Sequence, residues 1–121
     1  MASSLCLTAS LSLIAGLLTA ALAGTAVAGD DDRAAAAEIF TSRCVACHGM
    51  DGRGNGPASA SLKPRPVNFH DLKWQKATSD ETIAKAIVEG GAAVGISKQM
   101  MPNPDLEDQP GAVKALSLIH I

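Results

Sequence analysis

The stretch CVACHGMDGRGNGP, residues 44–57, decides how this chain folds. It places two thiols and an imidazole close together, at Cys44, Cys47 and His48, and then four glycines before Pro57. On a helical turn, positions i, i+3 and i+4 face the same side. The thiols and the imidazole can therefore reach one flat ligand together. The glycines would let the following backbone pass close to that ligand, where a Cβ would collide.

The spacing C-x-x-C-H is the attachment signature for c-type haem. Both thiols would add to the vinyl groups of the porphyrin, and His48 would bind the iron as proximal ligand. A disulfide or a thioredoxin-like redox pair would also use Cys44 and Cys47, but neither needs the histidine. Structural zinc needs four protein ligands, and only His70 remains as a further one. We therefore predict covalently attached haem c with iron as the cofactor.

The sequence before and just after the motif predicts a helix and then a long ordered loop. Residues 33–43, RAAAAEIFTSR, have high helix propensity and lead directly into the cysteines, so we expect helix and motif to be continuous. Residues 49–76 are rich in glycine and proline, which forbid a regular helix over that span. Such a loop in a compact domain is usually functional or wrapped around a ligand.

Two further helices are predicted in the second half of the chain. The first is TSDETIAKAIVEGG, in which Thr78 and Glu81 form a T-x-x-E capping box and Gly90 marks the end. The second begins near Pro110, with Asp108 as its N-cap.

The N-terminal 28 residues have the pattern of a secretory signal peptide. They contain an apolar run without charged side chains and end in Ala26-Val27-Ala28, the A-x-A pattern of a cleavage site. The alternative is an uncleaved membrane anchor, since the uncharged run is long enough to span a bilayer. We predict export to the periplasm, with attachment to the membrane only if this segment is retained. The chain holds ten basic and twelve acidic residues, which argues against nucleic acid as a partner.

The last six residues, LSLIHI, are what CTG TCT CTT ATA CAC ATC encodes, and that DNA resembles a transposon-type sequencing adapter. Our hypothesis is that residues 116–121 are a non-native tail, which is excluded from reasoning about the fold. The domain would then comprise residues 29–115, with an incomplete C-terminal helix. A domain of this size needs a cofactor or cross-link to supplement its core, and it contains only two phenylalanines and one tryptophan as large aromatic residues.

The segments CVACHG, GRGNGP, LKPRPVNF, SDETIAKAIVEGG and MP together resemble the small class I mono-haem cytochromes c of bacteria. The resemblance covers most of the predicted exported chain. It implies an all-α fold in which helices wrap around one covalently bound haem. It also implies that Phe40 packs against the C-terminal helix.

The resemblance further implies the remaining haem contacts. A methionine before proline supplies the sixth iron ligand in this family, which points to Met101 in QMMPNP, with Met100 as the competitor. The carbonyl of Pro57 would accept a hydrogen bond from the ring nitrogen of His48 that is not on iron. Trp74 would either donate to a haem propionate or be an ordinary core residue.

Iron that is bound by His48 and Met101 has no open position for a substrate. The sequence therefore predicts a periplasmic one-electron carrier, not an enzyme, that docks briefly on larger redox proteins. One alternative is a haem c subunit or domain of a larger respiratory or dehydrogenase complex. Another is an enzyme or sensor in which the methionine binds weakly or not at all and the iron is open to a small ligand.

Overall fold

The computed structural model describes residues 29–118. Every regular element in that range is helical, which confirms the all-α prediction, and no strand is present there. The α-helices are α1 (Asp30–Ile39), α2 (Val45–His48), α3 (Leu72–Ala77), α4 (Asp80–Glu89) and α5 (Pro110–Leu118). A π-helical turn occupies Phe40–Cys44, and short 3₁₀ turns occupy Ser59–Ser61, Gly91–Val94 and Pro104–Leu106.

The first helix and the cysteine motif are continuous, as predicted, but the junction between them is a π-helical turn. Within this turn, the N–H of Val45 donates to the carbonyl of Phe40, five residues earlier. The hydroxyl of Thr41 donates to the carbonyl of Ala37 at 2.8 Å, and that of Ser42 to the carbonyl of Glu38 at 2.8 Å. These side chains supply additional partners for carbonyls where the regular ladder is interrupted.

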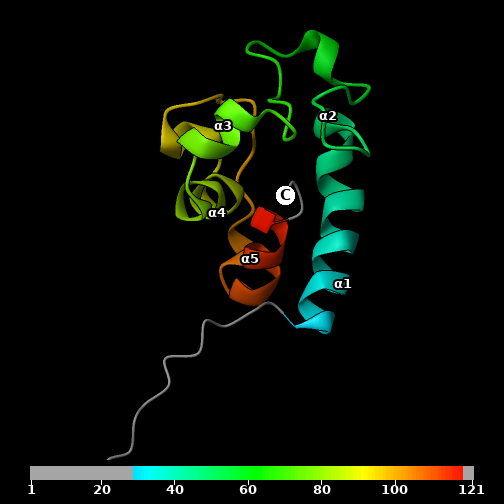
Figure 1. Ribbon diagram of the computed structural model, residues 1–121, viewed down its shortest axis with the longest axis vertical. Helices are drawn as coiled ribbons and strands as arrows, with labels where there is room; N and C mark the ends of the chain where they lie inside the picture. The colour runs from blue at the N-terminus through cyan, green and yellow to red at the C-terminus, as the bar shows by residue number, and fades with distance from the viewer. Residues whose placement is uncertain (1–28, 119–121) are drawn as a thin grey trace, which may run out of the picture.

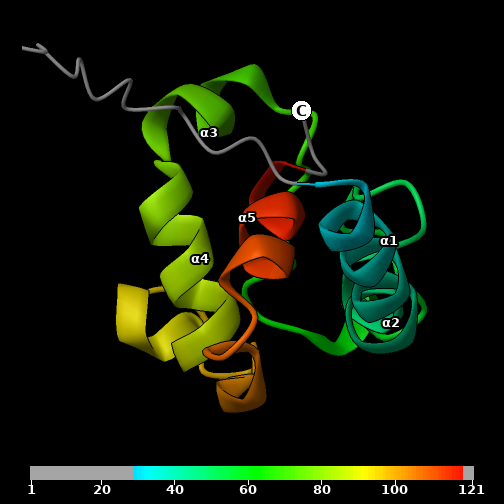
Figure 2. The same cartoon turned by 90° about the horizontal axis from the view of Figure 1, so that it is seen from below.

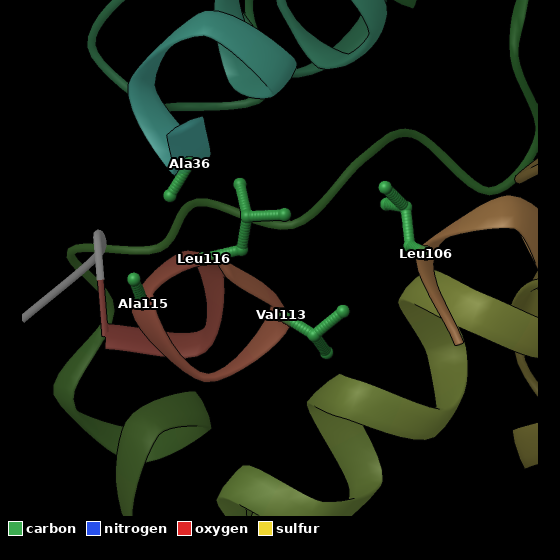
Figure 3. Packing of buried hydrophobic residues seen from close by; sticks show 5 residues of the cluster. All are labelled: Ala36, Leu106, Val113, Ala115 and Leu116. Carbon is green, nitrogen blue, oxygen red and sulfur yellow. The ribbon is translucent and has the colours of Figure 1, made fainter. Parts of the chain in front are cut away.

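The core forms where α5 lies between α1 and α4, an arrangement visible in Figures 1 and 2. Its buried apolar residues are Ala36, Leu106, Val113, Ala115 and Leu116. Figure 3 shows Leu116 of α5 facing Ala36 of α1. Phe40 is half-buried and packs against this cluster, to which both α1 and α5 contribute, and its predicted contact with the C-terminal helix stays a prediction.

Two helix boundaries differ from the prediction. The end of the predicted loop folds as α3, because Asp71 caps it by accepting a hydrogen bond from the N–H of Lys73 at 2.8 Å. The N-cap of α4 is Ser79, which accepts from the N–H of Thr82 at 3.2 Å. Thr78 was the wrong cap because it terminates α3 instead. The predicted end of α4 at Gly90 is confirmed.

The predicted terminal segments are only partly covered by the structure. Residues 116–118 complete α5, in which Leu116 and Ser117 are buried. The non-native origin of residues 116–121 stays a prediction, and residues 119–121 lie outside the described residues. The proposed signal peptide, residues 1–28, also lies outside them. Between residues 29 and 118, no helix has the length and apolar character needed to cross a membrane.

Candidate functional site

The two cysteines of the motif are held on one helical segment. Cys44 ends the π-helical turn and Cys47 lies in α2, and both are free, half-buried thiols. Burial raises the pKa of the Cys44 thiol, the nearby Cys47 acts in the same direction, and Arg43 opposes them. The thiol of Cys44 is thus mainly protonated at neutral pH, and neither cysteine forms a disulfide.

The imidazole of His48 completes this turn. Burial lowers the pKa of its ring, so at neutral pH the ring is uncharged, the form that binds a metal. The ring stacks on Phe69, with centroids 4.8 Å apart and planes inclined by 17°. Phe69 in turn contacts Trp74 at a centroid distance of 5.4 Å. No local sequence pattern indicates the contact between His48 and Phe69, because the two residues are far apart in the chain.

One nitrogen of the His48 ring, Nδ1, is buried without a hydrogen-bond partner. The predicted hydrogen bond to the carbonyl of Pro57 is therefore not formed in this structure, in which the ring is stacked on Phe69. Pro57 is exposed, and its role as acceptor stays a prediction. A buried, unpaired polar atom is unusual in a folded protein. The ring of His48 therefore has a buried polar atom for which the surrounding side chains supply no hydrogen-bond partner.

The glycine-rich loop that follows closes the end of α2. The last four carbonyls of a helix have no partner within it, and here all four are satisfied by loop N–H groups. The donor and acceptor pairs are Gly49 to Val45 (2.9 Å), Ala58 to Ala46 (2.8 Å), Gly56 to Cys47 (3.2 Å) and Gly54 to His48 (2.8 Å).

Two of these glycines are required by close approach of backbone to backbone. A Cβ on Gly56 would collide with the carbonyl oxygens of Val45 and Ala46. Gly54 has φ +71°, and a Cβ there would collide with the carbonyl of Pro66. The glycines therefore serve the protein's own backbone, in addition to the predicted passage beside a flat ligand.

The segment that carries the two methionines is fixed on the end of α4. The N–H of Gly91 donates to the carbonyl of Met100 at 3.0 Å. Asn103 donates from Nδ2 to the carbonyl of Ile87 at 2.9 Å, and its N–H donates to the carbonyl of Val88 at 2.9 Å. Met100 is half-buried, whereas Met101 is 70% exposed. Asn103 was missed at the sequence level, although its position between two prolines is a signal of a fixed turn.

Two contacts connect this segment to the part of the molecule that contains the cysteine motif and the loop after it. The side-chain oxygen Oε1 of Gln99 accepts from the N–H of Lys63 at 2.9 Å. The guanidinium Nη1 of Arg43 lies 3.0 and 2.8 Å from the carboxylate oxygens of Asp105. His70, which the zinc alternative would require as a further ligand, has its Nε2 at 2.7 Å from the carbonyl oxygen of Asp51.

A hollow of about 520 Å³ lies elsewhere, between α4 and α5. Its lining includes the apolar residues Ala84, Val88, Leu106 and Val113, together with charged side chains of both signs. None of the predicted ligands lines it, so we assign the site from the motif and not from this hollow.

Comparison with known proteins gives a consistent result. The family model described as Cytochrome c matches residues 33–112, a range that contains every predicted site residue. The chain is 32% identical over 87 residues to the "Cbb3-type cytochrome c oxidase subunit FixP" of Bradyrhizobium sp. (strain ORS 278). It is 30% identical over 87 residues to the protein of the same name from Bradyrhizobium diazoefficiens. Each match covers 72% of this chain but only 26% of the relative, so the chain spans about a quarter of the length of these relatives.

Proposed function

This chain belongs to the cytochrome c family, and from that premise we propose that it is a periplasmic one-electron carrier whose haem iron is bound by His48 and Met101. The family carries a covalently bound haem c, and the residues present suit that group. Cys44 and Cys47 are free thiols on one helical segment, and His48 is uncharged with an unpaired ring nitrogen. This arrangement is the observation that carries the proposal.

When bound, the haem supplies a one-electron couple between ferric and ferrous iron. The chain's own residues hold and surround it. Cys44 and Cys47 would fix it covalently to one turn, and His48 would bind the iron. A thioether is a soft ligand, and pairing it with histidine raises the reduction potential relative to harder ligand sets. With the iron bound by both His48 and Met101, the site would suit electron transfer better than catalysis on a substrate.

The geometry of the methionine segment supports Met101 over Met100. The carbonyl of Met100 is hydrogen-bonded to Gly91, and its Cβ lies against the same glycine. The base of its side chain thus packs on the 3₁₀ turn that follows α4. Met101, between this contact and Asn103, keeps an exposed side chain that is available to a ligand.

The experiment uses the full chain, expressed with haem-attachment machinery and exported. Mass spectrometry should show the addition of one haem, and the ferric protein should show the weak red absorption band of thioether bound to iron. Met101→Ala should abolish that band, whereas Met100→Ala should retain it. Cys44→Ala with Cys47→Ala should give protein without covalent haem. A wild-type protein with haem but no thioether band, and rapid carbon monoxide binding, would contradict the proposed ligation and favour an open iron site.

A second candidate function is favoured by the relatives. Both are named as subunits of a cbb3-type cytochrome c oxidase, and this chain matches only part of them. Under this alternative the chain is a haem c domain of a larger respiratory complex that exchanges electrons with its neighbouring subunits. Co-purification of the tagged native protein with an oxidase would support it. Recovery of the tagged protein as a monomer from the periplasmic fraction would support the free carrier.

A further inference from the structure

The methionine segment, residues 97–105, is connected at both ends to the half of the molecule that carries the cysteine motif. Gln99 lies two residues before Met101 and accepts a hydrogen bond from the N–H of Lys63. Asp105 lies four residues after Met101 and pairs with Arg43, the residue directly before Cys44. Met101 therefore lies between two points of attachment.

The segment that contains Lys63 is itself packed on the glycine-rich loop. Gly54 lies against the carbonyl of Pro66, and the N–H of Phe69 donates to the carbonyl of Gly52 at 2.9 Å. That loop closes the helix end that bears His48. A displacement of the methionine segment away from His48 would thus have to break the Gln99 contact on one side and the Asp105 contact on the other.

We propose that Gln99, Arg43 and Asp105 are positioning residues that hold the methionine segment in place and would slow the release of the thioether from iron. This inference rests on the proposed function, since it needs a methionine on iron. It applies to either methionine, because Met100 and Met101 both lie between Gln99 and Asp105.

These contacts should affect local opening much more than global unfolding. The side chains of Arg43 and Asp105 are 42% and 53% exposed, and exposed ion pairs contribute little to the stability of a whole domain. A loop, however, can open without unfolding the core, and then only its own contacts oppose the motion. The expected signature is faster exchange of the iron ligand at a nearly unchanged melting temperature.

The test measures the rate at which excess imidazole displaces the methionine in the ferric holoprotein, followed by loss of the thioether band. We expect Asp105→Asn and Gln99→Ala each to raise this rate about three- to fivefold. The double variant should raise it about nine- to twenty-five-fold, because the two contacts share no residue and their effects should multiply. The control is Glu89→Gln, which removes the exposed Lys85–Glu89 pair on α4 and should leave the rate unchanged.

The dependence of the exchange rate on ionic strength gives a second test, because a purely structural effect of the substitution would not respond to salt. High ionic strength screens exposed charges, so the rate ratio of Asp105→Asn to wild type should fall toward one in about 1 M salt. The ratio for Gln99→Ala, which loses an uncharged hydrogen bond, should change little. Asp105→Glu, which keeps the carboxylate, should exchange more slowly than Asp105→Asn.

The possible failures are distinguishable. A wild-type holoprotein without a thioether band refutes the proposed ligation. A wild-type protein that shows the band, with variants that exchange at the wild-type rate, refutes the positioning role alone. An equal acceleration in Glu89→Gln would also refute it, because loss of any surface carboxylate would then suffice.

Discussion

The two segments that we assign to the iron ligands are stabilised in opposite ways. The cysteine and histidine segment is closed by hydrogen bonds between near neighbours, such as Gly54 to His48 and Gly56 to Cys47. The methionine segment depends on partners that are remote in the chain. Asn103 bonds to Ile87 across 16 positions, Gln99 to Lys63 across 36, and Asp105 to Arg43 across 62.

This difference shows which half of the site a local sequence can determine. A helix turn with a loop that caps its end can form before the rest of the domain is assembled. The methionine segment reaches its position only when α1, α4 and the loop near Lys63 are in place. Thioether ligation should therefore report on the whole fold, whereas covalent attachment of haem reports on one turn.

The largest predicted effect comes from the point at which the methionine segment enters the core. Leu106 is 1% exposed and belongs to the same cluster as Ala36 and Val113. Leu106→Ala should lower the free energy of unfolding of the holoprotein by about 3 kcal/mol, because it removes buried area and leaves a cavity. Denaturant unfolding followed by circular dichroism gives the value. The thioether band should disappear at lower denaturant than the helical signal. A loss below about 1 kcal/mol would mean that this end of the segment is not held by the core.

The next largest loss of stability is expected in the cysteine segment, at its closest backbone contact. Gly56→Ala should cost about 2–3 kcal/mol, because a Cβ would force the loop away from the carbonyls of Val45 and Ala46. Gly95→Ala is the matched control. Gly95 has φ +74° but open space around its Cβ position, so only conformational strain of about 1 kcal/mol applies. If the two variants lose equal stability, close approach is not what selects glycine at position 56.

The sequence predicted those parts of the molecule whose causes are local. Helix propensity before the motif predicted α1 in nearly the right place, and the glycine at position 90 predicted the end of α4. The motif identified Cys44, Cys47 and His48, and the structure joins them on one helical segment. These features depend on residues within about one helical turn of one another.

The parts that were missed depend on context beyond one turn. Thr78 and Ser79 are both suitable N-caps, and only the presence of α3, which ends at Thr78, selects Ser79. The π-helical turn has no signature in propensity. The pair formed by Arg43 and Asp105 could not be inferred, because no periodicity relates residues separated by 62 positions.

A smaller effect is expected where the methionine segment rests on α4. Asn103→Ala removes the part-buried hydrogen bond from Nδ2 to the carbonyl of Ile87. Because the backbone N–H of Asn103 still contacts this region, we expect a loss of only about 1–1.5 kcal/mol in the free energy of unfolding. Asn103→Asp should cost more, since a carboxylate oxygen would then face the carbonyl. Chemical denaturation of both variants at pH 7 checks the order, and a reversed order would contradict the assigned role of the amide.

The smallest predicted effect concerns the start of α4, the helix that supports the methionine segment. Ser79→Ala should cost about 1 kcal/mol, because the N–H of Thr82 loses its acceptor. Thr78→Ala should cost less than half as much, and the reverse order would restore Thr78 as the cap.

Glu81, in the first turn of α4, adds a dependence of stability on pH. Hydrogen bonds from its own N–H and from Ser79 lower the pKa of Glu81 below 4.5. Its favourable contribution is thus complete above about pH 5 and is lost as acidification protonates the folded state. In Ser79→Ala the pKa of Glu81 should rise toward its ordinary value. Nuclear magnetic resonance titration of that carboxyl in both variants would measure the change, and an unchanged pKa would show that Ser79 does not hold it.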